Sequence, residues 1–158
     1  MTPAIRLLQR EKVAFEQHPY DHDDDNASFG DEAAAKLGID PVRMFKTLVC
    51  KADGALVMAL VPVAARLDLK LLAKALGTKK ADMADPGVAE RTTGYVVGGI
   101  TPLGGRKALP VFIDESLMTH DTVFLSAGRR GLQLELAPAD LVRLTKATLA
   151  PLAEPKSQ

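Results

Sequence analysis

Residues 45–63 read FKTLVCKADGALVMALVPV, and this stretch decides the fold. Two runs rich in strand-forming residues, 45–51 and 56–63, are separated by Asp53-Gly54. An Asp-Gly pair supplies the positive φ angles of a two-residue turn, so the sequence predicts a β-hairpin here. Pro62 has no N–H group and favours an edge position at the end of the second strand.

Short helices and strands surround this hairpin in irregular order. The clearest helix is predicted over 69–76, where Asp68 can cap the start, the leucines share one face and Gly77 ends the helix. Further helices are predicted to begin at or near Thr2-Pro3, Asp31, Asp85-Pro86 and Pro138. Further strands are predicted at 13–17, 109–113, 122–126 and 132–136.

Strands and helices mix without the regular βαβ alternation of a doubly wound sheet. We therefore expect an α/β (α+β) fold: a single compact domain with a mixed, curved β-sheet or barrel flanked by short helices. This domain is expected to span 1–150, with 151–158 as a flexible C-terminal tail.

Length and composition limit the classes of protein. The chain has 158 residues, enough for one domain with a sizeable core, and its 20 acidic and 20 basic residues balance. The balanced charge gives no overall field that would hold nucleic acid, so any such contact must be local. A single cysteine excludes an internal disulfide, and no apolar run approaches membrane-spanning length. We expect a soluble, cytoplasmic protein.

Residues 94–105, GYVVGGITPLGG, read as a short apolar strand that enters a glycine-rich binding loop. Glycines allow positive φ and the close approach of another molecule to main-chain amides, while Pro102 stiffens the far side. No serine, cysteine or histidine stands where a nucleophile elbow needs one, and no Gly-Lys-Ser/Thr follows as in a P-loop. The loop is expected to act through backbone polarisation, although a plain turn between strands would leave the same pattern.

Lys46 is the first side-chain candidate. Side chains alternate along a strand, so Lys46 shares a face with Leu48 and Cys50. A partly desolvated lysine can direct a cation at a phosphate, carbonyl or carboxylate. A lysine that merely extends to water from the strand start is the alternative.

Three other patterns are weaker candidates. The turn 126–131, SAGRRG, combines a hydroxyl with two arginines and suits a phosphate, but a hairpin with solvated arginines fits equally. The stretch 18–22, HPYDH, offers metal ligands, but an acidic loop broken by proline is expected to stay solvated, and we predict no metal site. Cys50 lies among apolar residues and is expected to be an inert core thiol.

Several motifs along the chain share one order with a known family. They are Thr2-Pro3-Ala4, Tyr20-Asp21-His22, Phe29-Gly30-Asp31-Glu32-Ala33-Ala34, Phe45-Lys46-Thr47, Thr93-Gly94-Tyr95, Gly98-Gly99-Ile100-Thr101-Pro102-Leu103-Gly104 and Gly131. Together they closely resemble the YbaK family of Cys-tRNA(Pro)/Cys-tRNA(Cys) deacylases, related to the editing domain of bacterial prolyl-tRNA synthetase. The resemblance runs from the first residues to about Ala147 and is more specific than any single glycine loop.

The resemblance implies a trans-acting deacylase that removes cysteine from the proline tRNA, and also acts on Cys-tRNA(Cys), with no metal or cofactor. It implies Lys46 and Gly98 as the catalytic residues. It also implies a substrate pocket lined by Tyr20, Phe29, Thr47, Gly99, Ser126 and Gly128. The implied partners are the acceptor end of aminoacyl-tRNA and prolyl-tRNA synthetase, with neither membrane nor DNA.

A missing protein nucleophile fits this activity, because the thiol of esterified cysteine can attack its own ester carbonyl. The enzyme then needs only orientation and an oxyanion site, which Gly98 would supply. Two alternatives stay open: a deacylase of Ala-tRNA(Pro), and a non-catalytic module that binds the aminoacylated tRNA end.

Overall fold

A computed structural model describes residues 1–156. The predicted hairpin forms its centre: β2 (Phe45–Ala52) and β3 (Ala55–Pro62) pair antiparallel. Asp53 and Gly54 join them with φ angles of 50° and 78°, as a two-residue hairpin turn requires. The hairpin prediction is therefore confirmed residue by residue at the turn.

The hairpin lies inside an open five-stranded mixed sheet with the order β5-β2-β3-β6-β9. β6 (Val111–Asp114) and β9 (Thr148–Ala150) continue it in parallel, and β5 (Asp82–Met83) lies antiparallel beside β2. The expected edge position of the second strand is wrong, since β3 lies between β2 and β6. Pro62 is tolerated there because β6 pairs only with Met58 to Leu60 and leaves the proline beyond its end.

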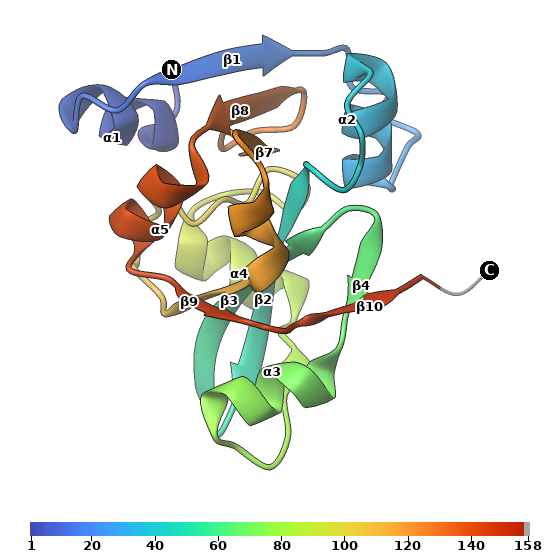
Figure 1. Ribbon diagram of the computed structural model, residues 1–158, viewed down its shortest axis with the longest axis vertical. Coiled ribbons are helices and arrows are strands. Elements are labelled where there is room, and N and C mark those ends of the chain that lie inside the picture. Colours follow the sequence, from blue (N-terminus) through green and yellow to red (C-terminus); the bar gives the residue numbers. More distant parts are fainter. Residues whose placement is uncertain (157–158) are drawn as a thin grey trace.

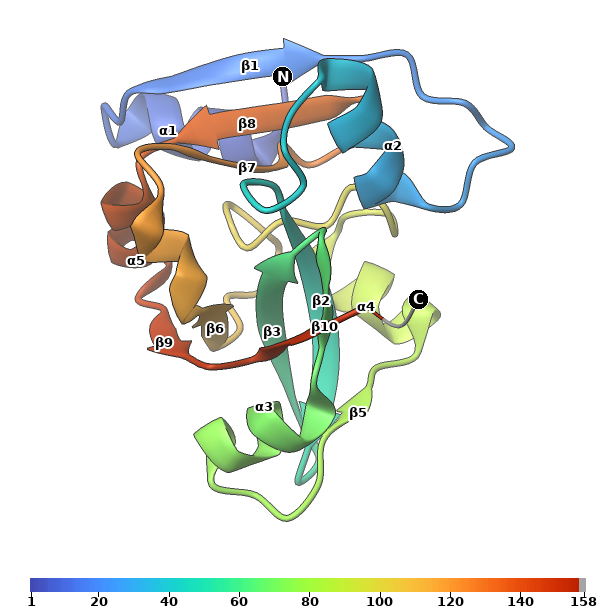
Figure 2. The same cartoon turned by 45° about the vertical axis from the view of Figure 1, so that its right-hand side comes forward.

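A second sheet has three antiparallel strands in the order β1-β8-β7. They are β1 (Phe15–Pro19), β7 (Val123–Ser126) and β8 (Leu132–Leu136), and Figure 2 shows β1 and β8 side by side at the top of the molecule. A single parallel bridge between Met44 and Phe124 connects this sheet to the chain entering β2. The start of β2 thus lies at the junction of the two sheets.

Helices flank the sheets, as predicted. The Thr2 hydroxyl accepts a hydrogen bond from the Ile5 amide at 3.2 Å, the Asp68 carboxylate caps the Lys70 and Leu71 amides, and Gly38 and Gly77 end their helices with positive φ. The helices are α1 (Pro3–Arg10), α2 (Phe29–Leu37), α3 (Leu69–Leu76), α4 (Pro86–Thr93), α5 (Pro138–Thr145) and a 3₁₀ helix, η1 (Glu115–Thr119).

The C-terminal segment is ordered where a flexible tail was expected. β10 (Ala153–Pro155) pairs with β4 (Ala65–Leu67), and Figure 1 shows it crossing the molecule beside β4. The Leu152 side chain is fully buried, and one Asp114 carboxylate oxygen accepts hydrogen bonds from the amides of Leu152 and Ala153 at 2.9 and 3.0 Å. The prediction of a tail from residue 151 is therefore wrong over 152–155; Ser157 and Gln158 lie outside the described residues.

These elements make a single compact α+β domain, which confirms the predicted fold class. The barrel alternative is wrong for the described residues, since β5 and β9 are the unpaired ends of an open sheet. The loop 94–105 contains no strand, so its expected apolar strand is also wrong. None of the helices within 1–156 is long and apolar enough to cross a membrane.

Candidate active site

A cavity of about 340 Å³ opens where the start of β2, the start of α2 and the glycine loop meet. Five of the residues predicted for the site line it, although they come from distant parts of the sequence: Phe29, Lys46, Thr47, Gly98 and Ser126. Apolar side chains such as Met44, Phe45 and Val63 line further parts of its wall. The fold thus places the Lys46 ammonium, the hydroxyl-bearing residues Thr47 and Ser126, and Gly98 around one cavity.

Lys46 is half-buried on β2, opposite Val61 of β3. Burial lowers the pKa of its ammonium, and the nearby positive charge of Lys156 acts in the same direction while Asp31 opposes it. Within residues 1–156 the Lys46 ammonium makes no hydrogen bond or ion pair of its own. A cation that is partly desolvated and uncommitted is available to a ligand in the cavity.

Gly98 occupies a position that another residue type could take only with a strained backbone and a shift of the Phe29 ring. Its φ is +90°, and a Cβ atom there would lie 2.7 Å from Cγ and Cδ1 of the Phe29 ring. α4 delivers the chain to this loop and ends at Gly94, whose φ is +80°. The close contact of Gly98 with Phe29 places bare main chain directly beside the cavity.

The amides of the loop are not equivalent. The Val97 N–H donates to a Glu90 carboxylate oxygen at 2.8 Å, and the Gly99 N–H donates to the Val96 carbonyl at 2.8 Å. Among these three consecutive residues, only the Gly98 N–H makes no hydrogen bond within the described chain. The Gly98 N–H is therefore free to bind a ligand, whereas the N–H groups of its two neighbours in sequence are already bonded.

Three residues predicted for the pocket do not line the cavity: Tyr20, Gly99 and Gly128. Tyr20 borders a separate depression with Asp21 and Arg129, and burial raises the pKa of its hydroxyl. The two glycines are required by packing, because a Cβ on Gly99 would lie 2.8 Å from the Arg129 Cα and one on Gly128 would lie 2.9 Å from the Tyr95 ring.

Gln133 is a cavity residue that the sequence analysis missed. It lies on β8, its side chain is buried, and its Oε1 atom makes no hydrogen bond within residues 1–156. The Thr47 hydroxyl is likewise buried and unpaired in that part of the chain. The alternation in Leu132-Gln133-Leu134 reads as an outward polar position, so no sequence signal distinguishes Gln133 from a solvated residue.

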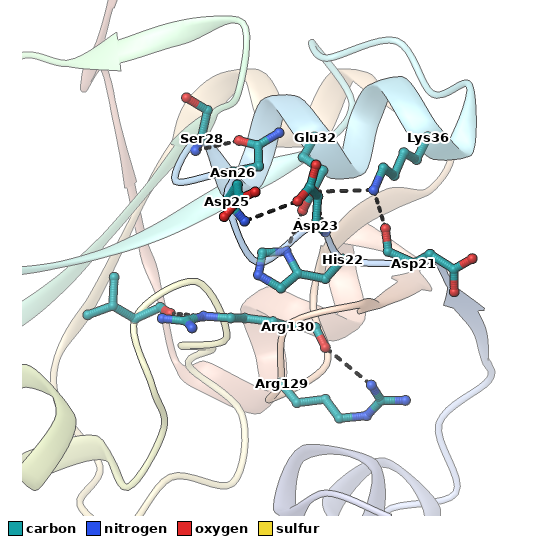
Figure 3. A network of polar contacts seen from close by, with 11 residues as sticks. Asp21, His22, Asp23, Asp25, Asn26, Ser28, Glu32, Lys36, Arg129 and Arg130 are labelled. Atoms are coloured by element: carbon teal, nitrogen blue, oxygen red, sulfur yellow. Dashed lines mark hydrogen bonds and ion pairs between the residues drawn. The ribbon is translucent and has the colours of Figure 1, made fainter.

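A buried carboxylate supports the helix that carries Phe29. Glu32 accepts hydrogen bonds from His22 Nδ1 at 2.6 Å, the Asp23 amide at 2.8 Å and the Lys36 ammonium at 3.3 Å (Figure 3). Burial alone would raise its pKa, but these donors outweigh that effect and lower the pKa to about 2. The network fixes the loop 21–26 against the start of α2.

The stretch 18–22 does not converge on one point. His22 faces Glu32 on α2, whereas His18 Nε2 lies 2.8 Å from an oxygen of Glu135 on β8, the strand beside its own. Cys50 is fully buried outside the cavity lining, and burial raises the pKa of its thiol to about 11. The described residues that line the cavity include neither histidine nor cysteine.

The fold and site define an α+β domain with a pocket built around a lysine and a free glycine amide. A family model described as an aminoacyl-tRNA editing domain matches residues 25–144, so the chain belongs to the aminoacyl-tRNA editing domain family. This confirms the resemblance to the YbaK family that the sequence predicts.

Known proteins support this membership. The chain is 38% identical over 150 residues to "Putative Cys-tRNA(Pro)/Cys-tRNA(Cys) deacylase EbsC" of Enterococcus faecalis, covering 94% of this chain and 91% of that protein. It is 30% identical over 109 residues to "Multifunctional Ser/Thr-tRNA deacylase ProXp-y" of Escherichia coli, covering 66% and 65%. It also superposes on the crystal structure of "a putative trans-editing enzyme for prolyl tRNA synthetase" with a TM-score of 0.80 and 27% identity, over 98% and 99% of the two chains.

Proposed function

We propose that this protein is a deacylase that clears Cys-tRNA(Pro), and also Cys-tRNA(Cys), in trans in the cytoplasm. One observation carries the proposal: the cavity combines Lys46 with the free Gly98 amide, and its described lining contains no histidine or cysteine to form a nucleophile–base pair. Such a site can orient an ester and stabilise negative charge, but its hydroxyl groups have no histidine beside them in the lining to activate them for attack.

The nucleophile then comes from the substrate. In this mechanism the cysteine thiolate forms a bond to its own carbonyl carbon, and the carbonyl oxygen becomes an oxyanion that the Gly98 N–H stabilises. The bond from that carbon to the ribose oxygen breaks, the ribose oxygen takes up a proton, and a cyclic thiolactone leaves. Lys46 holds the terminal ribose or phosphate and stabilises the developing charge.

The polar atoms of the cavity favour a side chain that can form a hydrogen bond. Thr47 and Gln133 present a hydroxyl and an acceptor oxygen that are buried and unpaired within 1–156. A thiol or hydroxyl of the substrate could pair with them, whereas the methyl group of alanine would leave both unsatisfied at a cost of about 1–3 kcal/mol each. These two atoms therefore support a cysteinyl over an alanyl substrate. Seryl and threonyl esters would satisfy them equally well, so the reaction step itself must discriminate against those two.

The test is a deacylation panel with cysteinyl, seryl, threonyl and alanyl esters on the proline and cysteine tRNAs. We expect release of cysteine and slow release of serine, because an alcohol is a much weaker nucleophile than a thiolate. Lys46→Ala should lose about a hundredfold or more in rate while it melts like the wild type. Lys51→Ala is the matched control, since Lys51 is an exposed lysine of the same strand.

Two results would overturn parts of the proposal. Serine released as fast as cysteine would refute the substrate-thiol mechanism and indicate attack by water. Saturable protection of Cys-tRNA(Pro) without turnover would favour the alternative, a module that binds the aminoacylated end and hands it on.

The proposal includes prolyl-tRNA synthetase as a partner that holds the body of the tRNA. The equal numbers of acidic and basic residues support this division, because the chain has little long-range attraction for RNA. Strong tRNA binding by the isolated protein with a steep salt dependence would refute it.

A further inference from the structure

Arg130 reaches across from the turn between β7 and β8 to the glycine loop. Its Nε donates a hydrogen bond to the Val97 carbonyl at 2.8 Å, drawn as a dashed line from Arg130 in Figure 3. Its guanidinium carbon lies 4.7 Å from the centre of the Phe29 ring. The side chain is otherwise exposed. It therefore joins three parts of the chain that are remote in sequence at the wall of the cavity.

The bonded carbonyl belongs to the same peptide unit as the proposed oxyanion donor. The C=O of Val97 and the N–H of Gly98 share one planar group, which is trans here, so the two point in opposite directions. A hydrogen bond from a charged group to this carbonyl directs the N–H away from Arg130 and polarises it. Gly98 lines the cavity, and in the proposed function this N–H is the donor to the ester oxygen.

Two further contacts hold the same unit in place. The Val97 N–H is fixed by Glu90, so Val97 is held through both its N–H and its C=O. The Phe29 ring lies against Gly98 and also contacts the Arg130 guanidinium. Rotation of the Val97–Gly98 peptide would have to break the Arg130 bond and disturb this stack.

We infer that Arg130 is a positioning residue of the site, which aims and polarises the Gly98 amide through the Val97 carbonyl. This inference rests on the proposed function of the cavity. It assigns Arg130 a role distinct from tRNA phosphate binding, which the two arginines of this turn would also suit by sequence.

The test separates the hydrogen bond from the charge. Arg130→Met keeps the side chain as far as the position of Nε but removes both the hydrogen bond and the charge. Arg130→Gln places an uncharged N–H at the position of Nε. Arg106→Met is the matched control, because Arg106 is also exposed and donates to a main-chain carbonyl, that of Arg91 at 3.2 Å. Deacylation of Cys-tRNA(Pro), urea unfolding and the amide NMR resonances are measured for each variant.

We expect Arg130→Met to lower kcat about tenfold to a hundredfold, the range for loss of a hydrogen bond to a charged group, with KM changed less than about threefold. Arg130→Gln should recover a large part of kcat, and Arg106→Met should keep it. The Gly98 amide resonance should move in Arg130→Met and less in Arg130→Gln, while that of Gly38 stays in place.

A rise in KM alone, equal in the Met and Gln variants, would overturn the inference in favour of phosphate binding. Unchanged kcat in a folded Arg130→Met variant would also overturn it, as would an unmoved Gly98 resonance. A wild type without deacylase activity would instead refute the proposed function, and the Gly98 resonance would still decide whether Arg130 controls that amide.

Discussion

Replacement of Gly98 by alanine gives the sharpest test of the site geometry. The residue has a φ of +90°, and the added Cβ would lie 2.7 Å from two atoms of the Phe29 ring and 2.9 Å from a third. The left-handed backbone alone costs about 1–2 kcal/mol for a non-glycine residue. The collision adds about 1–3 kcal/mol, since the ring must retreat from a contact with an ordinary distance of at least about 3.4 Å.

The sum predicts that Gly98→Ala lowers the free energy of unfolding by about 2–5 kcal/mol. Gly77→Ala is the matched control, because Gly77 has a φ of +74° and nothing lies within 4 Å of its Cβ position. It should lose only the backbone cost of about 1–2 kcal/mol. The difference between the two variants in urea unfolding therefore isolates the collision with Phe29.

The rate of deacylation by Gly98→Ala should fall much further than the loss of folded protein can explain. Displacing the free Gly98 amide should reduce Cys-tRNA(Pro) deacylation about a hundredfold to a thousandfold, measured with the protein in excess and under conditions where it stays folded. Gly77→Ala should keep full activity. If Gly98→Ala matched Gly77→Ala in both stability and rate, the close packing of Gly98 and its role as the oxyanion donor would both be refuted.

Three further substitutions test the core, the C-terminal segment and the carboxylate network. Cys50→Ala should keep deacylation within about twofold, since the thiol is buried with a pKa of about 11; a folded but inactive variant would make Cys50 a nucleophile. Leu152→Ala should lower the free energy of unfolding by about 2–5 kcal/mol, whereas a flexible tail would give a change near zero. Glu32→Gln should cost about 3 kcal/mol at pH 7 in urea unfolding. Folding lowers the pKa of Glu32 from 4.5 to about 2, so its carboxylate stabilises the folded protein fully above pH 4.5 and loses this effect as the pH falls from 4.5 towards 2. The difference in unfolding free energy between Glu32→Gln and the wild type should therefore shrink over this pH range. Asp24 is exposed, and Asp24→Asn should show no such trend.

Features set by neighbouring residues were predictable from the sequence. The Asp53-Gly54 turn, the Asp68 cap and the Gly77 end each depend on the conformational preferences of a few adjacent residues, and all three form as expected. Features set by distant partners were not predictable. Pro62 signals an edge strand, yet β6 pairs on that side of β3 and simply ends before the proline.

The same distinction separates the site residues. Phe29, Lys46 and Gly98 were identified through motifs and do line the cavity. Gln133 has no motif signal, because its burial results from the junction of the two sheets and not from its own strand pattern. The segment before β10 is similar: Leu152 is buried in an apolar cluster with residues of β3 and α3, and Asp114 accepts hydrogen bonds from the amides of Leu152 and Ala153.

In the proposed site, the group that stabilises the oxyanion is not the group that selects the amino acid. A free main-chain N–H stabilises the oxyanion of any aminoacyl ester, so the Gly98 amide cannot itself distinguish one amino acid from another. Thr47 and Gln133 can reject an alanyl side chain, but they accept a hydroxyl as readily as a thiol. Selection of cysteine over serine must then come from the nucleophile, because a thiol with a pKa near 8.5 ionises far more readily than an alcohol. One relative is named a Ser/Thr-tRNA deacylase, and serine and threonine carry no thiol. Hydrolysis requires that water reach the ester carbonyl beside Gly98, whereas thiolactone release does not. The access of water to this point of the cavity therefore decides which of the two reactions takes place.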